Sequence, residues 1–238
     1  MKTKFELAEV VRLFGKQLLN QKSIAPIHTK ALFNIVQCRT ASLGGNKKIC
    51  DSCGVVRYSY NSCGDRNCPK CQATKQQVWM EKLLESTLPI NHFHIVFTVP
   101  HVLNRICLWN NTLYYKILFS TVWRTLQSFG YSHYGVESGA VAILHTWGQN
   151  LSLHPHIHCL VPAADYSIQG KWKNIGKNNK YLYSVNQLSE AFKGKFLDSI
   201  KRELNKQNLL ADFNDEIQQA FSSKRVEYCE PSLANSNM

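Results

Sequence analysis

The segment from residue 38 to residue 72 places the strongest constraint on how this chain can fold. Cysteine, glycine, asparagine and aspartate replace the apolar periodicity seen elsewhere, so the segment cannot build an ordinary hydrophobic core. It holds two Cys-x-x-Cys pairs with fourteen residues between them, Cys50 with Cys53 and Cys68 with Cys71. Two such pairs can complete a closed tetrahedral site for structural zinc. We therefore predict these four cysteines as zinc ligands; the alternative is a loop of free thiols with little to order it.

The other cysteines are predicted to have lesser roles. Cys38 and Cys63 lie near the pairs and could exchange into the site, but we predict them as buried thiols or as groups around the ligands. Cys107, Cys159 and Cys229 have no ligand-like partners and are predicted to be small core residues. Charged residues interrupt the N-terminal stretch, so no signal peptide is predicted, and no apolar run reaches the about 18 residues that span a bilayer. We therefore expect reduced thiols and a cytoplasmic protein.

The charge balance favours a polyanionic partner. The chain has 28 Lys and Arg against 16 Asp and Glu, a formal net charge of +12. Such an excess promotes binding to nucleic acid through counterion release. Arg57, Arg66, Lys70 and Lys75 lie around the cysteine pairs, and we predict that they contact DNA. The alternative is that they are solvated surface charges.

A run of alternating histidines is the second candidate site. His154, His156 and His158 would all face one side of a strand, because the side-chain period of a strand is two. Two neutral imidazoles on one face can bind one divalent ion. The same His-x-His pattern occurs at His92 and His94, and a half-buried strand with histidines on its polar face is the alternative in both places.

The periodicity predicts an α+β fold in which an antiparallel sheet is layered against helices. A small helical and zinc-binding domain over residues 1–88 is followed by a larger domain over 89–238. The predicted helices cover residues 4–20, 28–37, 73–87, 110–129, 186–207 and 213–221. The predicted strands cover residues 92–100, 139–148, 154–163 and 181–185.

Four sequence blocks carry a family resemblance. They are CRTASLGG at 38–45, YNSCGDRNCPKCQ at 60–72, HFHIVFTVP at 92–100 and AVAILHTWGQNLSLHPHIHCLVPA at 140–163. Together they resemble the insertion-sequence transposases of the HUH class, which move by rolling-circle replication. In that class a zinc-binding domain precedes a nuclease domain with a five-stranded antiparallel sheet of RRM-like type. The resemblance places the His-hydrophobic-His motif on His156, Ile157 and His158.

The resemblance also implies ligands and chemistry. The zinc ligands would be Cys50, Cys53, Cys68 and Cys71, as the spacing predicts. His154 would flank the motif, and the His92 and His94 pair would lie on the strand surface. His156 and His158, with a third polar ligand from a later helix, would hold Mg²⁺ or Mn²⁺. A tyrosine on that helix would then attack single-stranded DNA at an element end, giving a 5′-phosphotyrosine and a free 3′-hydroxyl.

This sequence departs from the family pattern in two respects. Asn46 and Asn67 stand where the family commonly has histidine. The family's YLxRYTHR-like tyrosine motif is absent, and we assign the nucleophile to none of the available phenols, which are Tyr166, Tyr181, Tyr183 and Tyr228. We therefore predict a transposase domain that is incomplete at its C-terminus and has no catalytic tyrosine. The alternatives are a non-catalytic zinc-dependent DNA-binding protein derived from a transposase, and a replication initiator or relaxase, which generally lacks this cysteine module.

Overall fold

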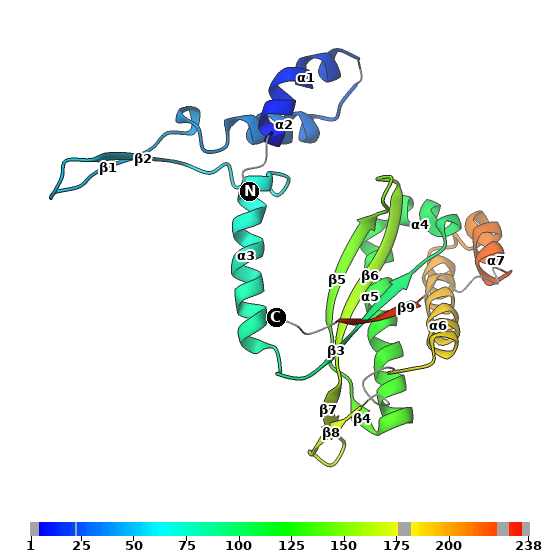
Figure 1. Ribbon diagram of the computed structural model, residues 1–238. Coiled ribbons are helices and arrows are strands. Elements are labelled where there is room, and N and C mark those ends of the chain that lie inside the picture. The colour runs from blue at the N-terminus through cyan, green and yellow to red at the C-terminus, as the bar shows by residue number, and fades with distance from the viewer. Residues whose placement is uncertain (1–4, 22, 176–181, 223–228, 235–238) are drawn as a thin grey trace. The chain divides into compact units, whose positions relative to one another are not determined.

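The computed structural model describes residues 5–21, 23–175, 182–222 and 229–234 of the chain (Figure 1). The fold is α+β, as predicted. The chain divides into two compact units, Met1–Thr87 and Leu88–Met238. The division lies one residue from the boundary expected at 88/89.

The described part of the first unit is built from three α-helices, one short 3₁₀-helix and a two-stranded ribbon. The elements are α1 (Leu7–Gln21), α2 (Pro26–Gln37), the short helix η1 (Ala41–Leu43), β1 (Gly45–Ile49), β2 (Val56–Tyr60) and α3 (Pro69–Ser86). The helix α3 begins four residues before its predicted start, because Pro69 occupies the first helical turn and Cys68 the N-cap. The buried cluster of this unit consists of Ala8, Ile35, Cys38, Cys68 and Cys71, with Cys63 packed beside it. Cysteine thus supplies most of a very small core.

The second unit contains a four-stranded antiparallel sheet in the order β5-β6-β3-β9. Its strands are β3 (His92–Thr98), β5 (Val141–Trp147), β6 (Leu153–Pro162) and β9 (Cys229–Ala234). Among the described residues this sheet has four strands, where the resemblance implied five. A separate small sheet joins β4 (Val136–Glu137), β7 (Ala164–Ser167) and β8 (Trp172–Asn174).

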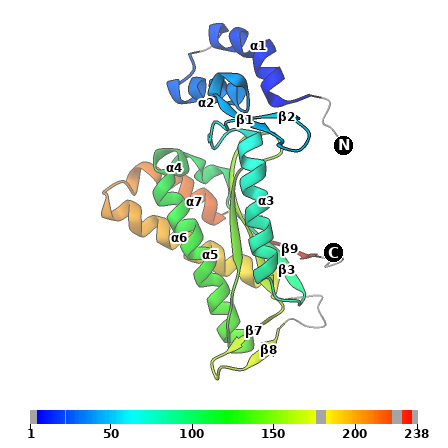
Figure 2. The same ribbon diagram turned by 90° about the vertical axis from the view of Figure 1, so that its left-hand side faces the viewer.

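The helices of this unit cover one face of the sheet (Figures 1 and 2). They are η2 (His101–Leu103), α4 (Asn104–Trp109), α5 (Asn111–Phe129), the π-helical turn η3 (Gly130–Tyr134), α6 (Val185–Lys206), η4 (Ala211–Phe213) and α7 (Asn214–Ser222). The strand predicted over 181–185 is wrong for the described residues 182–185: Val185 already belongs to α6, and Leu182 and Tyr183 are buried in the connection before it. Tyr181 lies outside the described residues.

Strand alternation separates the core from the open face of the sheet. Ile157 and Cys159 of β6 are fully buried and belong to the core beneath the helices, as does Phe97 of β3. Their neighbours His156 and His158 point to the other face and are half-buried. The core therefore fixes which side of the sheet presents histidine.

Substitution of Phe192 of α6 tests how much this core contributes to stability. It is fully buried, and its ring centroid lies 5.0 Å from that of Phe97 and 5.7 Å from that of Phe196. We expect Phe192→Ala to lower the free energy of unfolding by about 3–5 kcal/mol, because it removes apolar burial and leaves a cavity. Phe119→Ala on α5 is the matched control, since Phe119 is 37% exposed, and its cost should stay near about 1 kcal/mol. Urea unfolding of the full chain measures both, and equal losses would contradict this account of the core.

Candidate functional site

Four cysteines of the first unit converge on one point. Cys38 follows α2, Cys63 precedes α3, Cys68 is the N-cap of α3, and Cys71 lies in its first turn. Their Sγ atoms all lie within 4.8 Å of one another, with 3.6 Å between Cys38 and Cys71 and 3.7 Å between Cys63 and Cys71. Zinc–sulfur bonds of about 2.3 Å in a tetrahedron put sulfur atoms about 3.8 Å apart. The cluster therefore fits a structural zinc ion.

The structure does not bring the four predicted zinc ligands together. Cys68 and Cys71 join Cys38 and Cys63, whereas Cys50 and Cys53 lie in the turn between β1 and β2, where both are exposed. The reason is the ribbon itself, which the sequence did not predict. Five residues of strand cover about 16 Å at a rise of about 3.3 Å each, so the turn is carried away from the end of the ribbon where Cys63 follows.

The thiols of the cluster influence one another strongly. Burial raises the pKa of Cys63 to about 12 and also raises the pKa of Cys38. Burial acts in the same direction on Cys71, but hydrogen bonds from Cys38, the Gly64 backbone and Cys63 outweigh it and lower the pKa of Cys71 to about 7. One thiolate accepting hydrogen bonds from neighbouring thiols is an arrangement in which bound zinc would replace the shared protons.

Three histidines of the second unit form another candidate metal site. His145 of β5 lies directly opposite His156 of β6 in the antiparallel register, and His158 is the next residue along the same face. One nitrogen from each of the three rings lies within 4.8 Å of the others. The predicted residues His156 and His158 are thus joined by a third imidazole from the neighbouring strand, and within the described part of the chain no group from a later helix joins them.

The ring orientations of the two predicted histidines are fixed by hydrogen bonds. His156 Nδ1 lies 2.6 Å from the backbone oxygen of His154, and since a carbonyl only accepts, Nδ1 carries the proton and Nε2 has a free lone pair. His158 Nδ1 lies 2.7 Å from Nε2 of His94, which leaves His158 Nε2 available. Such bonds to the second ring nitrogen orient metal-binding histidines. His94, predicted as strand surface, therefore contacts the cluster directly.

The cluster favours neutral imidazoles, the form that binds metal. Burial, followed by the nearby His145, His156 and His94, lowers the pKa of His158 to about 4. Burial and then His156 also lower the pKa of His145, whose ring stacks on Trp147 with 5.6 Å between centroids. Both rings are therefore uncharged near neutral pH.

An open polar cleft of about 680 Å³ lies over the histidines. It is lined by Val96, Thr98, His101, Trp147, Gly148, Gln149, Asn150, Ser152, His154, His156 and His158. Thr98 Oγ1 is buried there and has no hydrogen-bond partner among the described residues. The cleft thus offers polar groups next to the three imidazoles, on the face of the sheet opposite the helices.

Four basic residues were predicted to contact DNA, and the structure places all of them in the first unit. Arg57 lies on β2, while Arg66 and Lys75 lie near the cysteine cluster, and all three side chains are exposed. Lys70 is half-buried and pairs with Glu6, with 2.8 Å between Nζ and Oε2, so its charge is already compensated.

The described tyrosines downstream of the histidines include no evident nucleophile. Tyr166 is exposed on β7, in the small sheet. Tyr183 is buried in the core, where burial raises its pKa to about 12. Tyr181 and Tyr228 lie outside the described residues.

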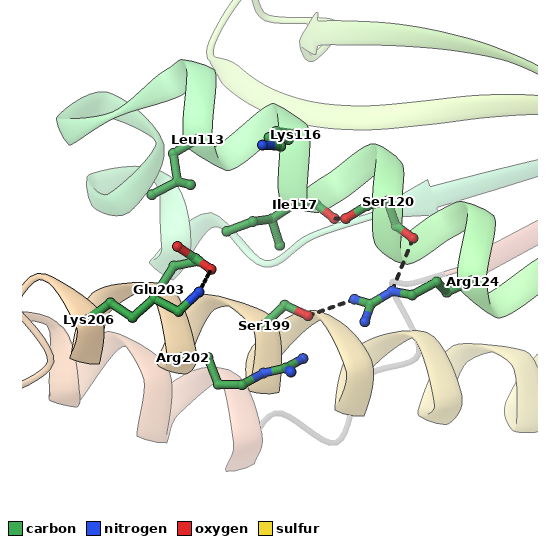
Figure 3. A pocket seen from close by; sticks show the side chains of 9 residues that line it. All are labelled: Leu113, Lys116, Ile117, Ser120, Arg124, Ser199, Arg202, Glu203 and Lys206. Carbon is green, nitrogen blue, oxygen red and sulfur yellow. Dashed lines mark hydrogen bonds and ion pairs between the residues drawn. The ribbon is translucent and has the colours of Figure 1, made fainter.

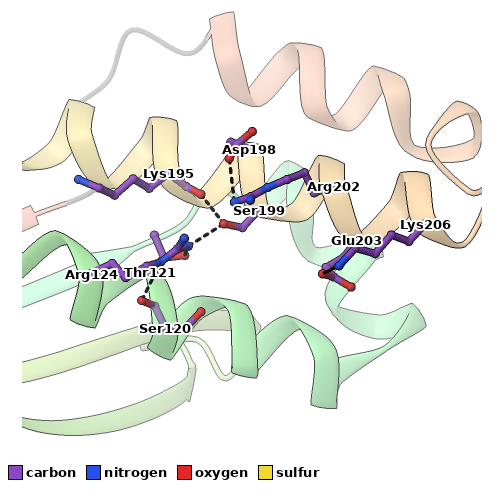
Figure 4. A network of polar contacts seen from close by, with 9 residues as sticks. All are labelled: Ser120, Thr121, Arg124, Lys195, Asp198, Ser199, Arg202, Glu203 and Lys206. Carbon is purple, nitrogen blue, oxygen red and sulfur yellow. Dashed lines mark hydrogen bonds and ion pairs between the residues drawn. The ribbon is translucent and has the colours of Figure 1, made fainter.

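A second cleft, of about 380 Å³, lies between α5 and α6 (Figure 3). Several of its charged side chains form ion pairs with neighbours on the same helix. Lys206 pairs with Glu203 at 2.7 Å, and Arg202 pairs with Asp198 at 2.9 Å. Arg124 of α5 donates a hydrogen bond of 2.7 Å to Ser199 of α6 (Figure 4). We therefore interpret this network as a contact that joins the two helices.

Known proteins resemble both units. Residues 10–99 match a family described as a transposase zinc-binding domain, and residues 139–230 match one described as a putative transposase. The chain belongs to the insertion-sequence transposase family that its sequence resembles. This transposase chain is 37% identical over 201 residues to a putative transposase, y4qJ, of Sinorhizobium fredii (strain NBRC 101917 / NGR234), a match that covers 83% of the chain. It is 30% identical over 172 residues, 69% of the chain, to the transposase for insertion sequence element IS801 of Pseudomonas savastanoi pv. phaseolicola.

The transposase chain spans about half the length of these relatives: the matches cover 50% of the first and 40% of the second. A solved structure of the conjugative relaxase TrwC in complex with OriT DNA is similar over 61% of this chain and 57% of the relaxase chain, with a TM-score of 0.39 and 10% identity. A likeness this distant supports no inference. Within the part of the chain that the structure describes, no helix has the length and apolar character needed to cross a membrane.

Zinc binding distinguishes the observed cysteine cluster from the predicted ligand set. We expect Cys38→Ser and Cys63→Ser each to reduce the zinc content of the purified chain and to lower its thermal stability, because structural zinc contributes folding energy. Cys50→Ser, at the exposed turn, should leave both unchanged. Metal analysis by mass spectrometry and a thermal melt measure the outcome. Zinc lost from Cys50→Ser but retained by Cys38→Ser would restore the predicted ligand set.

Proposed function

We propose that this chain is the DNA-binding and metal-holding part of a transposase that nicks and rejoins single-stranded element ends. The observation that carries the proposal is the cluster of His145, His156 and His158 on the open face of a sheet whose other face is sealed by helices. Family membership supports transposition as the process. A zinc-dependent DNA-binding protein without catalysis is the second candidate. Either protein would work in the cytoplasm.

The three imidazoles are proposed to hold one divalent ion. Nitrogen ligands suit Mn²⁺ better than Mg²⁺, which prefers oxygen, so we expect Mn²⁺ to bind more tightly. When bound, the ion would polarise a DNA phosphate and stabilise charge on the group being transferred. The carbonyl of His154 holds the ring of His156 in place, and His94 does the same for His158.

The cleft is proposed to receive the DNA strand. Its polar lining, including the exposed amides of Gln149 and Asn150, can donate hydrogen bonds to phosphate oxygens next to the imidazoles. A single strand suits this site, because its backbone can approach closely where a packed duplex cannot. Among the described residues no tyrosine lines the cleft, so we propose that these residues bind DNA and do not supply the nucleophile.

The cysteine cluster is proposed to bind the structural zinc through Cys38, Cys63, Cys68 and Cys71. The ion would fix the start of α3 against the end of α2. Arg66 and Lys75 would then be held at a defined place for contacts with DNA phosphates. Such contacts supply affinity that falls steeply with salt.

Mn²⁺ binding tests the histidine site directly. We expect the double variant His156→Ala/His158→Ala to lose Mn²⁺ binding, measured by electron paramagnetic resonance of free Mn²⁺. His94→Ala should weaken binding about 10-fold to 100-fold, because His158 loses the bond that orients its ring. His92→Ala is the matched control, being the other histidine of the same strand, and it should have no effect. Mn²⁺ binding that survives the double variant would reject the site.

Single-stranded oligonucleotides that tile the DNA flanking the gene test the proposed substrate. We expect salt-sensitive binding of at least one oligonucleotide and no covalent adduct in the presence of Mn²⁺, because no tyrosine among the described residues lines the cleft. A gel-shift assay measures binding, and denaturing electrophoresis detects a covalent protein–DNA adduct. An adduct that disappears in His156→Ala/His158→Ala would show that the chain does supply a nucleophile. Binding equally strong in 1 M salt would argue against a DNA-binding role.

A further inference from the structure

The ribbon formed by β1 and β2 is exposed along its whole length. Every residue of Gly45–Ile49 and of Val56–Tyr60 is exposed, and in Figure 1 the ribbon extends away from the helices of its unit. An isolated two-stranded hairpin is at best marginally stable in water. This one is tied at its base, where the amide of Asn61 donates to the backbone oxygen of Gly44 at 3.0 Å, and at its turn, where Cys50 N donates to Val55 O at 3.0 Å.

The two faces of the ribbon differ in chemistry. Directly paired residues share a face, and the faces alternate along the strands. One face is wholly polar and carries the pairs Asn46 with Ser59 and Lys48 with Arg57. The other face carries Lys47, Ile49, Val56, Tyr58 and Tyr60. The ribbon, including its turn, has three cations and one carboxylate, Asp51.

The polar face places two cations opposite each other. Lys48 is the direct cross-strand partner of Arg57, and like charges in that position destabilise a sheet. The salt bridges among the described residues include neither side chain. Among the described residues, no carboxylate pairs with either cation to offset this repulsion. An anionic partner would therefore relieve it.

The width of the ribbon and the side chains of its polar face suit the major groove of duplex DNA. The major groove of duplex DNA is about 12 Å wide and admits a two-stranded ribbon. Arginine and lysine pair with guanine O6 and N7, asparagine pairs with adenine, and serine can pair with either. Asn46, Lys48, Arg57 and Ser59 are all side chains of this kind.

We infer that the β1–β2 ribbon is a duplex-reading arm, which enters the major groove with Asn46, Lys48, Arg57 and Ser59 against base edges. The inference rests on the proposed DNA-binding function and adds a duplex contact to the single strand at the histidines. Binding of a single strand through base stacking on Tyr58 and Tyr60 is the competing outcome, since these side chains are 63% and 44% exposed on the opposite face.

The experiment begins with selection of preferred duplexes by the full chain from a randomised 20-base-pair library. Affinity for the enriched duplex is then measured by fluorescence anisotropy for the chain and for Lys48→Gln/Arg57→Gln. We expect at least a tenfold loss for this variant, because two cations that pair with guanine are removed. The control is Lys16→Gln/Lys82→Gln, which removes the same charge from exposed sites on α1 and α3 and should change affinity less than twofold.

Two further measurements identify the groove and exclude misfolding. Replacing guanine by 7-deazaguanine removes the N7 acceptor, so it should weaken the unaltered chain and have little effect on Lys48→Gln/Arg57→Gln. The same variant should keep its zinc and show a thermal midpoint that is unchanged or higher, because a like-charge pair has been removed.

Several results would overturn the inference. These are selection that yields no preferred duplex, equal losses in the variant and its control, or insensitivity of the unaltered chain to 7-deazaguanine. Preference for single strands that depends on Tyr58 and Tyr60 would assign the ribbon to base stacking instead. None of these results affects Mn²⁺ binding by His156 and His158, so failure of this inference is distinguishable from failure of the proposed function.

Discussion

The histidine cluster depends on the burial of the alternate residues of β6. Ile157, Cys159 and Val161 are fully buried under the helices, so their intervening neighbours must face the open side. A shift of β6 by one residue in its pairing with the neighbouring strands would exchange its buried and open-face residues and place imidazoles in an apolar core. Since that exchange would expose three apolar side chains and bury polar ones, the hydrophobic effect holds His156 and His158 in register with His145 on the adjacent strand. The candidate metal site is therefore positioned by side chains on the opposite face of the strand.

The first unit follows a different principle, because few of its apolar side chains are buried. Its buried cluster is made chiefly of Cys38, Cys68 and Cys71, with only Ala8 and Ile35 added. A unit with so small a buried core gains folding free energy from a bound metal ion. The base of the ribbon depends on the same cluster, since Asn61, which anchors β2 to Gly44, is separated from Cys63 by a single residue. Zinc at this point would order both the helices and the arm that projects from them.

The sequence predicted most of the regular elements but only some of the residues that the structure brings together in the two clusters. Helical periodicity and strand alternation located α1, α2, α3, α5, α6, β3, β5 and β6 to within a few residues, because these signals are local. His145 was not predicted, and Cys38 was predicted only as a residue that could exchange into the zinc site, because each reaches its cluster through pairing or packing of distant segments. The main error came from the β1–β2 hairpin, which the sequence did not predict. When β1 and β2 pair, Cys50 and Cys53 lie at the turn, whereas Cys63 lies near the base of the hairpin. His94 belongs to a His-x-His sequence, as His156 does, so the sequence alone could not assign its role. The register of β3 against β6 shows that His94 lies next to His158 and is hydrogen-bonded to it.

The same geometry explains how the chain tolerates asparagine at the two positions where the family commonly has histidine. The cysteine cluster offers four sulfur atoms, which are enough to complete a tetrahedral zinc site without histidine. Asn67 lies in the turn before Cys68, where its amide and its side chain both donate to Asp65 Oδ1, at 2.8 Å and 3.1 Å. This turn brings Cys68 to the N-cap of α3, so asparagine supports the site as a turn former. Asn46 lies on the polar face of the ribbon instead, where a change from histidine to asparagine alters what the face can bind and leaves the zinc ligands untouched.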